Sequence, residues 1–155
     1  MADWQTALET VAAAYARGTL EKDARTISEA YRLKTGEGRR LLTRKSQAAA
    51  YALSRMPATV EAAKAALTEA LAATGLAPKT LLDCGAGTGA VTFAADALLG
   101  LERATCLERE AAMRAVGRQL MREAGGVQAE WAACDLTAKE PLPRAGLVCE
   151  GYMLG

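Results

Sequence analysis

The sequence predicts an α/β protein in which an all-helical N-terminal region precedes a parallel sheet. Two observations predict it. Up to about residue 75, apolar residues recur every three or four positions, as in Trp4, Leu8 and Val11, which is the period of an amphipathic helix. From Lys79 onward, short apolar runs alternate with segments of helical length. Such alternation implies right-handed crossovers between parallel strands.

The helical region divides at turn-forming residues. Breaks are expected at Gly18-Thr19 and between Thr35 and Gly38. Pro57 is expected in the first turn of the last helix of this region, where its missing N–H costs nothing. The four helices are then expected near residues 4–15, 27–33, 41–53 and 57–75.

The second region reads as strands separated by helices. Strands are expected at 80–84, 104–107, 127–133 and 146–149, with helices at 88–99 and 110–124. We therefore expect two parts, a helical region over 1–75 and a sheet-forming part over 76–155. The last strand would leave an edge with unpaired backbone groups, which is a candidate surface for self-association.

Composition bounds the class of protein. The chain has 155 residues, is 51% hydrophobic and carries a net charge of +1, which suits a soluble globular domain. No run approaches the roughly 20 apolar residues that span a bilayer. The opening residues 1–4 do not form a secretory signal. A cytoplasmic protein without membrane contact is expected.

The cysteines predict no metal site. They form no CxxC pair, and the chain contains no histidine. All four lie in or just after apolar runs, so we expect them to be small buried side chains. They are Cys84, Cys106, Cys134 and Cys149.

A glycine-rich segment, residues 83–89, joins the first predicted strand to a helix. Glycine permits a sharp turn and a close approach of the backbone to a ligand. The N–H groups at the start of the helix are expected to face a polar or anionic ligand group, with Thr88 as the N-cap. The spacing of Gly85, Gly87 and Ala90 also fits a dinucleotide-binding domain, which therefore stays an alternative.

Three acids favour a different cofactor, S-adenosylmethionine (SAM). Asp83 precedes the glycines and would repel a pyrophosphate, whereas the amino group of SAM is positively charged. Glu108 ends the next strand and can accept both ribose hydroxyls. Asp135 ends the third strand and can accept from the adenine amino group. Each acid taken alone also fits a solvated or capping carboxylate.

These motifs resemble class I SAM-dependent methyltransferases with a Rossmann-like core. The segments at 81–89, 107–109, 134–136 and 147–155 carry this resemblance. The stretches at 51–59, 102–109 and 152–155 further resemble a methyltransferase-like family associated with the small ribosomal subunit. Its members occur in bacteria and, as ribosome assembly factors, in mitochondria. The family implies seven strands in the order 3-2-1-4-5-7-6, of which four are expected here.

The resemblance also implies a SAM site and a partnership with small-subunit ribosomal RNA. Glycines 85, 87 and 89 would line the methionine end, Glu108 the ribose and Asp135 the adenine. A downstream cysteine cluster of the family has no counterpart in this chain. No catalytic residue is assigned. The expected cofactor-binding residues are Asp83, Gly85, Ala86, Gly87, Gly89, Glu108, Arg109, Asp135, Leu136 and Tyr152.

Charge leaves the function open between two classes. Residues 1–60 hold 10 Lys or Arg against 6 Asp or Glu, and the cluster from Arg32 to Lys45 supplies most of the excess. Clustered cations bind RNA phosphates by releasing counterions, although a solvated helix face also explains them. The sequence therefore predicts a SAM-dependent methyltransferase acting on or with this RNA. The alternative is a non-catalytic assembly factor that binds RNA.

Overall fold

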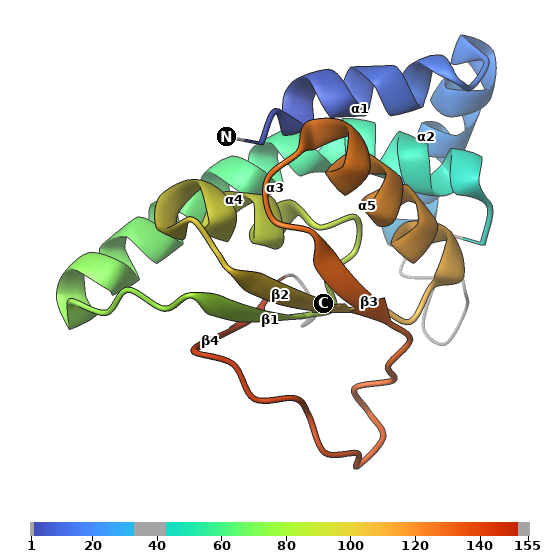
Figure 1. The fold of residues 1–155 in the computed structure, drawn as a ribbon. Helices are drawn as coiled ribbons and strands as arrows, with labels where there is room; N and C mark the ends of the chain where they lie inside the picture. Colours follow the sequence, from blue (N-terminus) through green and yellow to red (C-terminus); the bar gives the residue numbers. More distant parts are fainter. Residues whose placement is uncertain (1, 33–42, 152–155) are drawn as a thin grey trace.

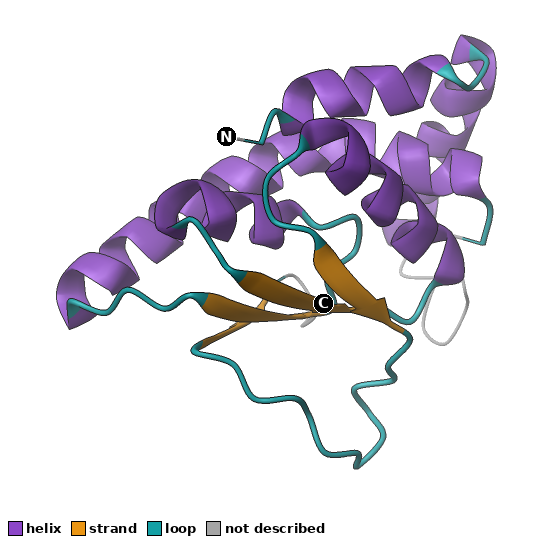
Figure 2. Ribbon diagram, in the orientation of Figure 1, coloured by secondary structure: helices purple, strands orange, loops and turns teal. Residues whose placement is uncertain are grey.

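Helices come first in the chain; strands then alternate with helices until the last two strands, which no helix separates. This order agrees with the sequence prediction. The computed structural model describes residues 2–32 and 43–151. Figures 1 and 2 show the elements in space. Their bounds are α1 Trp4–Ala13, α2 Arg17–Arg32, α3 Lys45–Thr74, β1 Thr80–Cys84, α4 Ala90–Leu99, β2 Arg103–Leu107, α5 Ala111–Ala124, β3 Ala129–Ala132 and β4 Leu147–Glu150.

The strands form one parallel sheet in the order β3-β2-β1-β4. β1 lies inside the sheet, where Asp83 pairs with Cys106 of β2 and with Cys149 of β4. In parallel strands all carboxyl ends meet at one edge, and ligands of open α/β sheets bind at that edge. The predicted parallel sheet and its strand order are confirmed.

The helices of the described residues lie on one face of the sheet (Figures 1 and 2). They share a single apolar core with it, in which Trp4 of α1, Val60 of α3, Leu81 of β1 and Val116 of α5 are all buried. Removal of this shared surface from water holds the N-terminal helices and the sheet together.

The opposite face of the sheet is covered differently. Leu82 and Leu107 are buried there against Leu136 and Ala145 of the segment between β3 and β4. That segment contains no helix, and in Figure 1 it passes on the side away from the helices. Val148 of β4 is 56% exposed. One loop therefore protects this face, whereas helices protect the other.

α3 corrects the predicted boundary between a third and a fourth helix. Pro57 lies inside one continuous helix, Lys45–Thr74, and not in a first turn. An interior proline costs a helix about 3 kcal/mol. Met56 and Val60 flank it and are 2% and 0% exposed. Burial of each contributes about 1.5–3 kcal/mol, which offsets that cost. Residues 41 and 42, also predicted helical, lie outside the described residues.

α2 corrects a second boundary. The break predicted at Gly18-Thr19 is wrong, because both residues lie in the first turn of α2 and the chain turns just before them. A Cβ at Gly18 would meet nothing within 4 Å. Glycine costs a helix about 1 kcal/mol relative to alanine, and this is too little to end a helix whose Ile27 is 5% exposed in the core.

The cysteines are all unpaired thiols. Cys84 and Cys106 are buried, as predicted, whereas Cys134 and Cys149 are only partly buried. Burial raises the pKa of Cys149 to about 11. Within the described part of the chain, no three Cys, Asp or Glu side chains are grouped closely enough to hold a metal ion.

Candidate functional site

The glycine loop, residues 85–89, joins the end of β1 to the start of α4. Gly85, Gly87 and Gly89 have φ angles of 67°, 58° and 97°. Glycine is required at position 89 for two reasons. The positive φ angle disfavours other residues, and a Cβ there would lie 2.9 Å from Cε of Met121 on α5. The loop is the tight turn that the sequence predicts, and α5 packs directly behind it.

Three amides of this loop are bonded inside the protein. The N–H of Ala86 donates to the carbonyl of Leu107, and that of Gly89 donates to the carbonyl of Ala86, each at 2.9 Å. The N–H of Gly87 donates to Oε1 of Glu108 at 3.2 Å. The expectation that free N–H groups would face an anionic ligand is therefore wrong for these amides. A pyrophosphate would find no free donor in them.

Thr88 does not cap α4, contrary to prediction. The helix begins at Ala90, and Gly89 precedes it without a side-chain hydrogen bond. The Thr88 side chain is buried, and its hydroxyl donates to Sδ of Met56 at 3.8 Å. Because the helix starts two residues later than predicted, Thr88 instead attaches the loop to α3.

Glu108 connects the end of β2 to the glycine loop. Its Oε2 accepts a hydrogen bond from the N–H of Glu110 at 2.7 Å, while Oε1 accepts from Gly87. Burial raises the pKa of Glu108, and these two hydrogen bonds oppose the rise. A carboxylate has about four lone-pair sites, so Glu108 keeps the capacity to accept from further donors such as hydroxyl groups.

Asp83 lies beneath the loop and not on an open surface. It is 1% exposed, and its Oδ2 accepts a hydrogen bond from the hydroxyl of Thr92 on α4 at 2.8 Å. Its Oδ1 has no partner among the described residues. Burial raises the pKa of Asp83 to about 7, and the Glu108 charge adds to the rise. A direct contact of Asp83 with a ligand, as expected from the sequence, is therefore not available in this conformation.

A small hollow of about 40 Å³ lies between the glycine loop and α3. Its walls come from elements far apart in sequence, because α3 packs against α4 at the carboxyl end of β1. The lining residues are Tyr51, Arg55, Met56, Thr59, Gly85, Ala86, Gly87, Thr88, Ala90, Val91 and Gly151.

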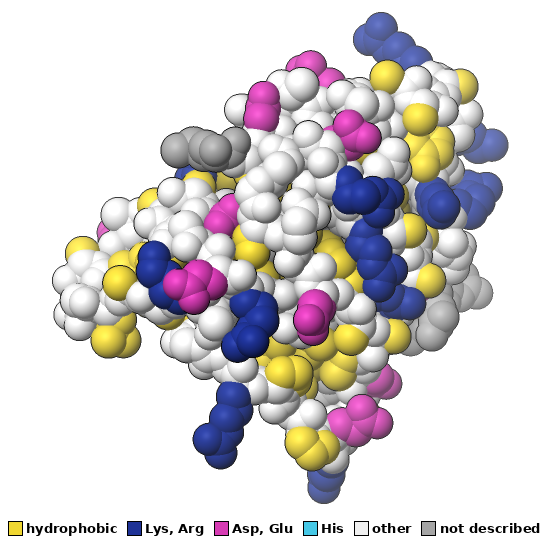
Figure 3. Space-filling model, viewed as in Figure 1, with side chains coloured by type: hydrophobic (Ala, Val, Ile, Leu, Met, Phe, Trp, Pro, Cys, Tyr) yellow, Lys and Arg dark blue, Asp and Glu magenta, His cyan; other side chains and the backbone are white. Residues whose placement is uncertain are grey.

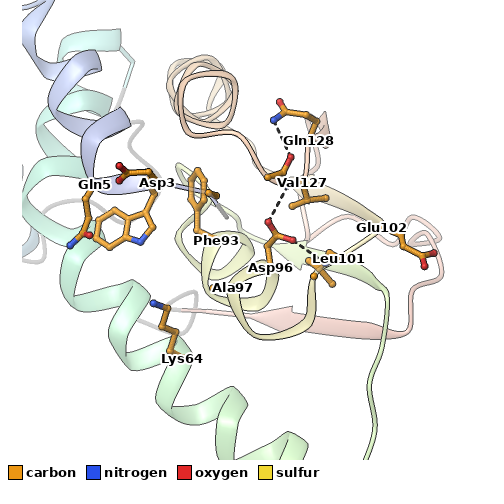
Figure 4. Close-up of a pocket in the computed structure, with 14 residues that line it drawn as sticks. Asp3, Gln5, Lys64, Phe93, Asp96, Ala97, Leu101, Glu102, Val127 and Gln128 are labelled. Carbon is orange, nitrogen blue, oxygen red and sulfur yellow. Dashed lines mark hydrogen bonds between the residues drawn. The ribbon is translucent and has the colours of Figure 1, made fainter.

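A larger hollow, of about 820 Å³, lies at the opposite edge of the sheet, where β2 and β3 begin (Figure 4). Its central acid, Asp96, already accepts from the N–H groups of Leu101 and Val127 at 2.9 and 3.0 Å. These bonds hold the end of α4 against the starts of two strands. The smaller hollow is the better candidate for chemistry, because it adjoins the glycine loop and Glu108.

Asp135 follows β3 and is exposed. Its Oδ1 accepts from the N–H and the hydroxyl of Thr137 at 2.9 and 2.6 Å, and these bonds lower the pKa of Asp135. The nearby charge of Arg109 lowers it further. The parallel pairing of β2 with β3 places the ends of these two strands side by side. Arg109 itself pairs with Glu110 at 3.3 Å.

The remaining predicted site residues lie elsewhere. Leu136 packs on the face of the sheet that carries no helices, against Leu82 and Leu107. Tyr152 lies outside the described residues, although Gly151 just before it lines the hollow. The structure thus brings the glycine loop and Glu108 together at the carboxyl edge, with Asp135 near Arg109.

The comparison with protein families matches residues 45–155 to the family described as mitochondrial small ribosomal subunit Rsm22. This match includes α3, the glycine loop and every strand of the sheet. The chain belongs to the Rsm22 family. The predicted resemblance to methyltransferase-like proteins of the small ribosomal subunit is confirmed at this level.

Solved structures resemble this Rsm22-family chain in part. The plantazolicin methyltransferase BpumL, solved with a substrate analogue and SAH, is 12% identical with a TM-score of 0.50, and the match covers 94% of this chain. PH1948 of Pyrococcus horikoshii, described provisionally as an RNA methyltransferase, is 27% identical over 58% of this chain, with a TM-score of 0.47. The match covers 49% of the first protein and 44% of the second. The first likeness confirms the partial Rossmann-like fold. The comparison with curated proteins gave no match.

The sequence alone did not identify the α3 wall of the hollow in this Rsm22-family chain. Tyr51, Arg55 and Thr59 recur every four residues, which places them on one side of a helix. That spacing was a usable signal. Their approach to the glycine loop, more than 25 residues further along the chain, is a tertiary contact that periodicity does not reveal.

Proposed function

We propose that this chain is the cofactor-binding part of a SAM-dependent methyltransferase that acts on or with small-subunit ribosomal RNA. The observation that carries the proposal is the hydrogen bond between Glu108 and Gly87. It holds a carboxylate with spare acceptor capacity beside a glycine turn at the carboxyl edge of a parallel sheet. This arrangement fits a nucleoside whose ribose hydroxyls donate to Glu108.

The residues present fit this cofactor by charge as well as by shape. Asp83, Glu108, Asp135 and Glu150 end the four strands or lie just after them, so this edge is rich in acids. SAM supplies a methyl group on a positively charged sulfonium. In the proposed site, Gly85, Ala86, Gly87 and Gly89 line the methionine end, Glu108 holds the ribose and Asp135 the adenine, with Arg109 nearby and Tyr152 as a further proposed contact. Asp83 lies beneath the glycine loop and Leu136 on the other face of the sheet, so neither touches the cofactor directly.

The dinucleotide alternative is less well supported. A pyrophosphate carries negative charge and is usually held by backbone N–H groups of the glycine loop. The amides of Ala86, Gly87 and Gly89 are already bonded to protein acceptors. The Glu108 carboxylate beside the loop would also repel it.

Calorimetric titration of the protein with SAM, S-adenosylhomocysteine (SAH) and NAD tests the cofactor. We expect SAM and SAH to bind and NAD not to bind. Binding of NAD without SAM would overturn the proposal. Glu102 lies at the amino end of the same strand as Glu108 and is exposed, so Glu102→Ala serves as the matched control for Glu108 variants.

The RNA part of the proposal rests on family and charge. The family description names the small ribosomal subunit. Lys and Arg side chains gather over α5 and α2 in Figure 3. The exposed cations of these two helices include Arg17, Lys22, Arg25, Arg118 and Arg122. Such a surface favours RNA phosphates by counterion release.

A non-catalytic assembly factor is the second candidate. It would use the same RNA-binding surface, and it differs from the methyltransferase only in catalysis. Glu150, at the end of β4, is the described acid nearest in sequence to the region where catalytic groups are expected. Transfer of a labelled methyl group from SAM to small-subunit RNA separates the two candidates. RNA binding without transfer, under conditions where SAM binds, would favour the assembly factor.

The location and the self-association surface remain sequence-based proposals. Among the described residues, every helix is too short or too polar to cross a bilayer. We propose a cytoplasmic location, which fractionation of the source cells tests. β4 pairs with β1 and with no other described strand. If its free edge mediates self-association, sedimentation should report a concentration-dependent dimer, which Val148→Lys should weaken.

A further inference from the structure

The small hollow beside the glycine loop has one helical wall. Tyr51, Arg55 and Thr59 line it from the same side of α3. Met56, next to Arg55, is 2% exposed, and its Sδ accepts a hydrogen bond from the hydroxyl of Thr88 at 3.8 Å. The wall is therefore fixed against the loop.

Charge at this edge singles out Arg55. It is the cation among the described lining residues, and it forms no ion pair with any described residue. The neighbouring arginines are engaged, since Arg109 pairs with Glu110 and Arg114 donates to two carbonyls at the end of β2. Arg55 is also exposed, so its guanidinium remains available to an anionic group that enters the hollow.

The hollow has room for a compact group. Its volume is about 40 Å³, about three times the roughly 10–15 Å³ that a cavity needs to hold one water. A carboxylate is a group of suitable size. Guanidinium groups bind carboxylates with two parallel hydrogen bonds.

We propose that Arg55 binds the carboxylate at the amino-acid end of the cofactor. This inference rests on the proposed SAM site and adds a residue of α3 to it. Arg55 then acts as a positioning and specificity residue. It distinguishes ligands that carry an amino-acid carboxylate from nucleosides that share the adenosine and thioether but lack the carboxylate.

Two ligands test this inference on the full chain by calorimetry. SAH carries the carboxylate, and 5′-methylthioadenosine does not. We expect Arg55→Met to weaken SAH binding roughly 10- to 100-fold, the range for a hydrogen bond to a charged group, and to leave 5′-methylthioadenosine binding unchanged. Arg55→Lys, which restores a charge without the planar fork, should recover part of the loss. Arg103→Met, at an exposed arginine where β2 begins, is the matched control and should bind both ligands normally.

The outcomes separate the two proposals. Unchanged SAH binding in Arg55→Met would overturn the role of Arg55 while leaving the SAM site intact. Equal losses for both ligands would also overturn it, because Arg55 would then act through the fold. If the unaltered protein binds neither ligand, the SAM site itself is wrong and the role of Arg55 falls with it.

Discussion

Glu108 at the end of β2 accepts a hydrogen bond from the backbone N–H of Gly87, with 3.2 Å between Oε1 and N. The bond spans 21 residues of sequence and fixes the glycine loop to the neighbouring strand. A single carboxylate therefore serves two roles, one in holding the loop and one in the proposed contact with ribose.

The first prediction concerns this carboxylate. Glu108→Ala should lower the affinity for SAM by about 1.5–3 kcal/mol, because hydrogen bonds to a charged group are lost. Calorimetry measures it, with Glu102→Ala as the control at the far end of β2. Thermal unfolding in parallel reports the loss of the loop contact. An unchanged SAM affinity would remove Glu108 from the ribose role.

The second prediction concerns Gly117 on α5, which lies against the indole of Trp131 on β3. A Cβ at Gly117 would lie 2.3 Å from Cη2 of Trp131, so the indole must move. We expect Gly117→Ala to lower the free energy of unfolding by about 1–3 kcal/mol, as overpacking usually does. Urea denaturation followed by tryptophan fluorescence measures the change.

Gly18→Ala is the matched control for that prediction. It is also a helical glycine, but a Cβ there would meet nothing within 4 Å. It should stabilise the protein by about 0.5–1 kcal/mol, because alanine is the better helix former. A loss of stability equal to that of Gly117→Ala would contradict the packing argument.

Local pattern predicted the strands better than the helix boundaries. The strand at 80–84 was predicted with its observed bounds, since a short apolar run ending in a glycine turn has few other interpretations. The position of Pro57 was predicted wrongly because proline is compatible with the first turn of a helix and also with the interior of a helix that packing stabilises. The burial of Met56 and Val60, which decides between them, is tertiary information.

The site was predicted unevenly for the same reason. Glu108 was found because acids at strand ends share an edge once the sheet is parallel. Asp83 was expected to face a ligand, but the structure buries it against Thr92. Strand alternation explains this: the Asp83 side chain points to the face that α4 covers. Arg55 could not be predicted as a site residue because its place in the hollow beside the glycine loop depends on how α3 packs.

The third prediction concerns RNA and rests on the proposed function. Reversing Arg39 and Arg40, which lie outside the described residues, to Glu should weaken RNA binding and flatten its salt dependence. Arg44 is unsuitable for this test, since it pairs with buried Asp23 at 2.9 Å and its loss would disturb the fold. Reversal of exposed Lys139 and Arg144 in the β3–β4 segment matches the charge change. If both pairs of reversals weakened RNA binding equally, net charge alone would explain the result and the RNA contact of Arg39 and Arg40 would be contradicted.

The last prediction concerns pH and Asp83. Burial raises the pKa of this carboxyl from 3.8 to about 7 in the folded protein. Between those values the unfolded chain has released the proton and the folded protein keeps it, so the unfolded state binds fewer protons and stability falls as the pH rises. The contribution of the protonated form is fully present below about pH 4 and is lost through pH 7.

Asp83→Asn should remove this pH dependence, because the amide cannot ionise yet still accepts from Thr92. The variant should therefore gain stability relative to the unaltered protein as the pH rises from 5 to 8, as measured by the free energy of unfolding. The change should be on the order of a few kcal/mol, since each pKa unit corresponds to about 1.4 kcal/mol. The raised pKa of Glu108 acts in the same direction in both proteins, so the comparison uses the difference between the two curves. Parallel stability curves across this pH range would show that Asp83 is ionised in the folded protein.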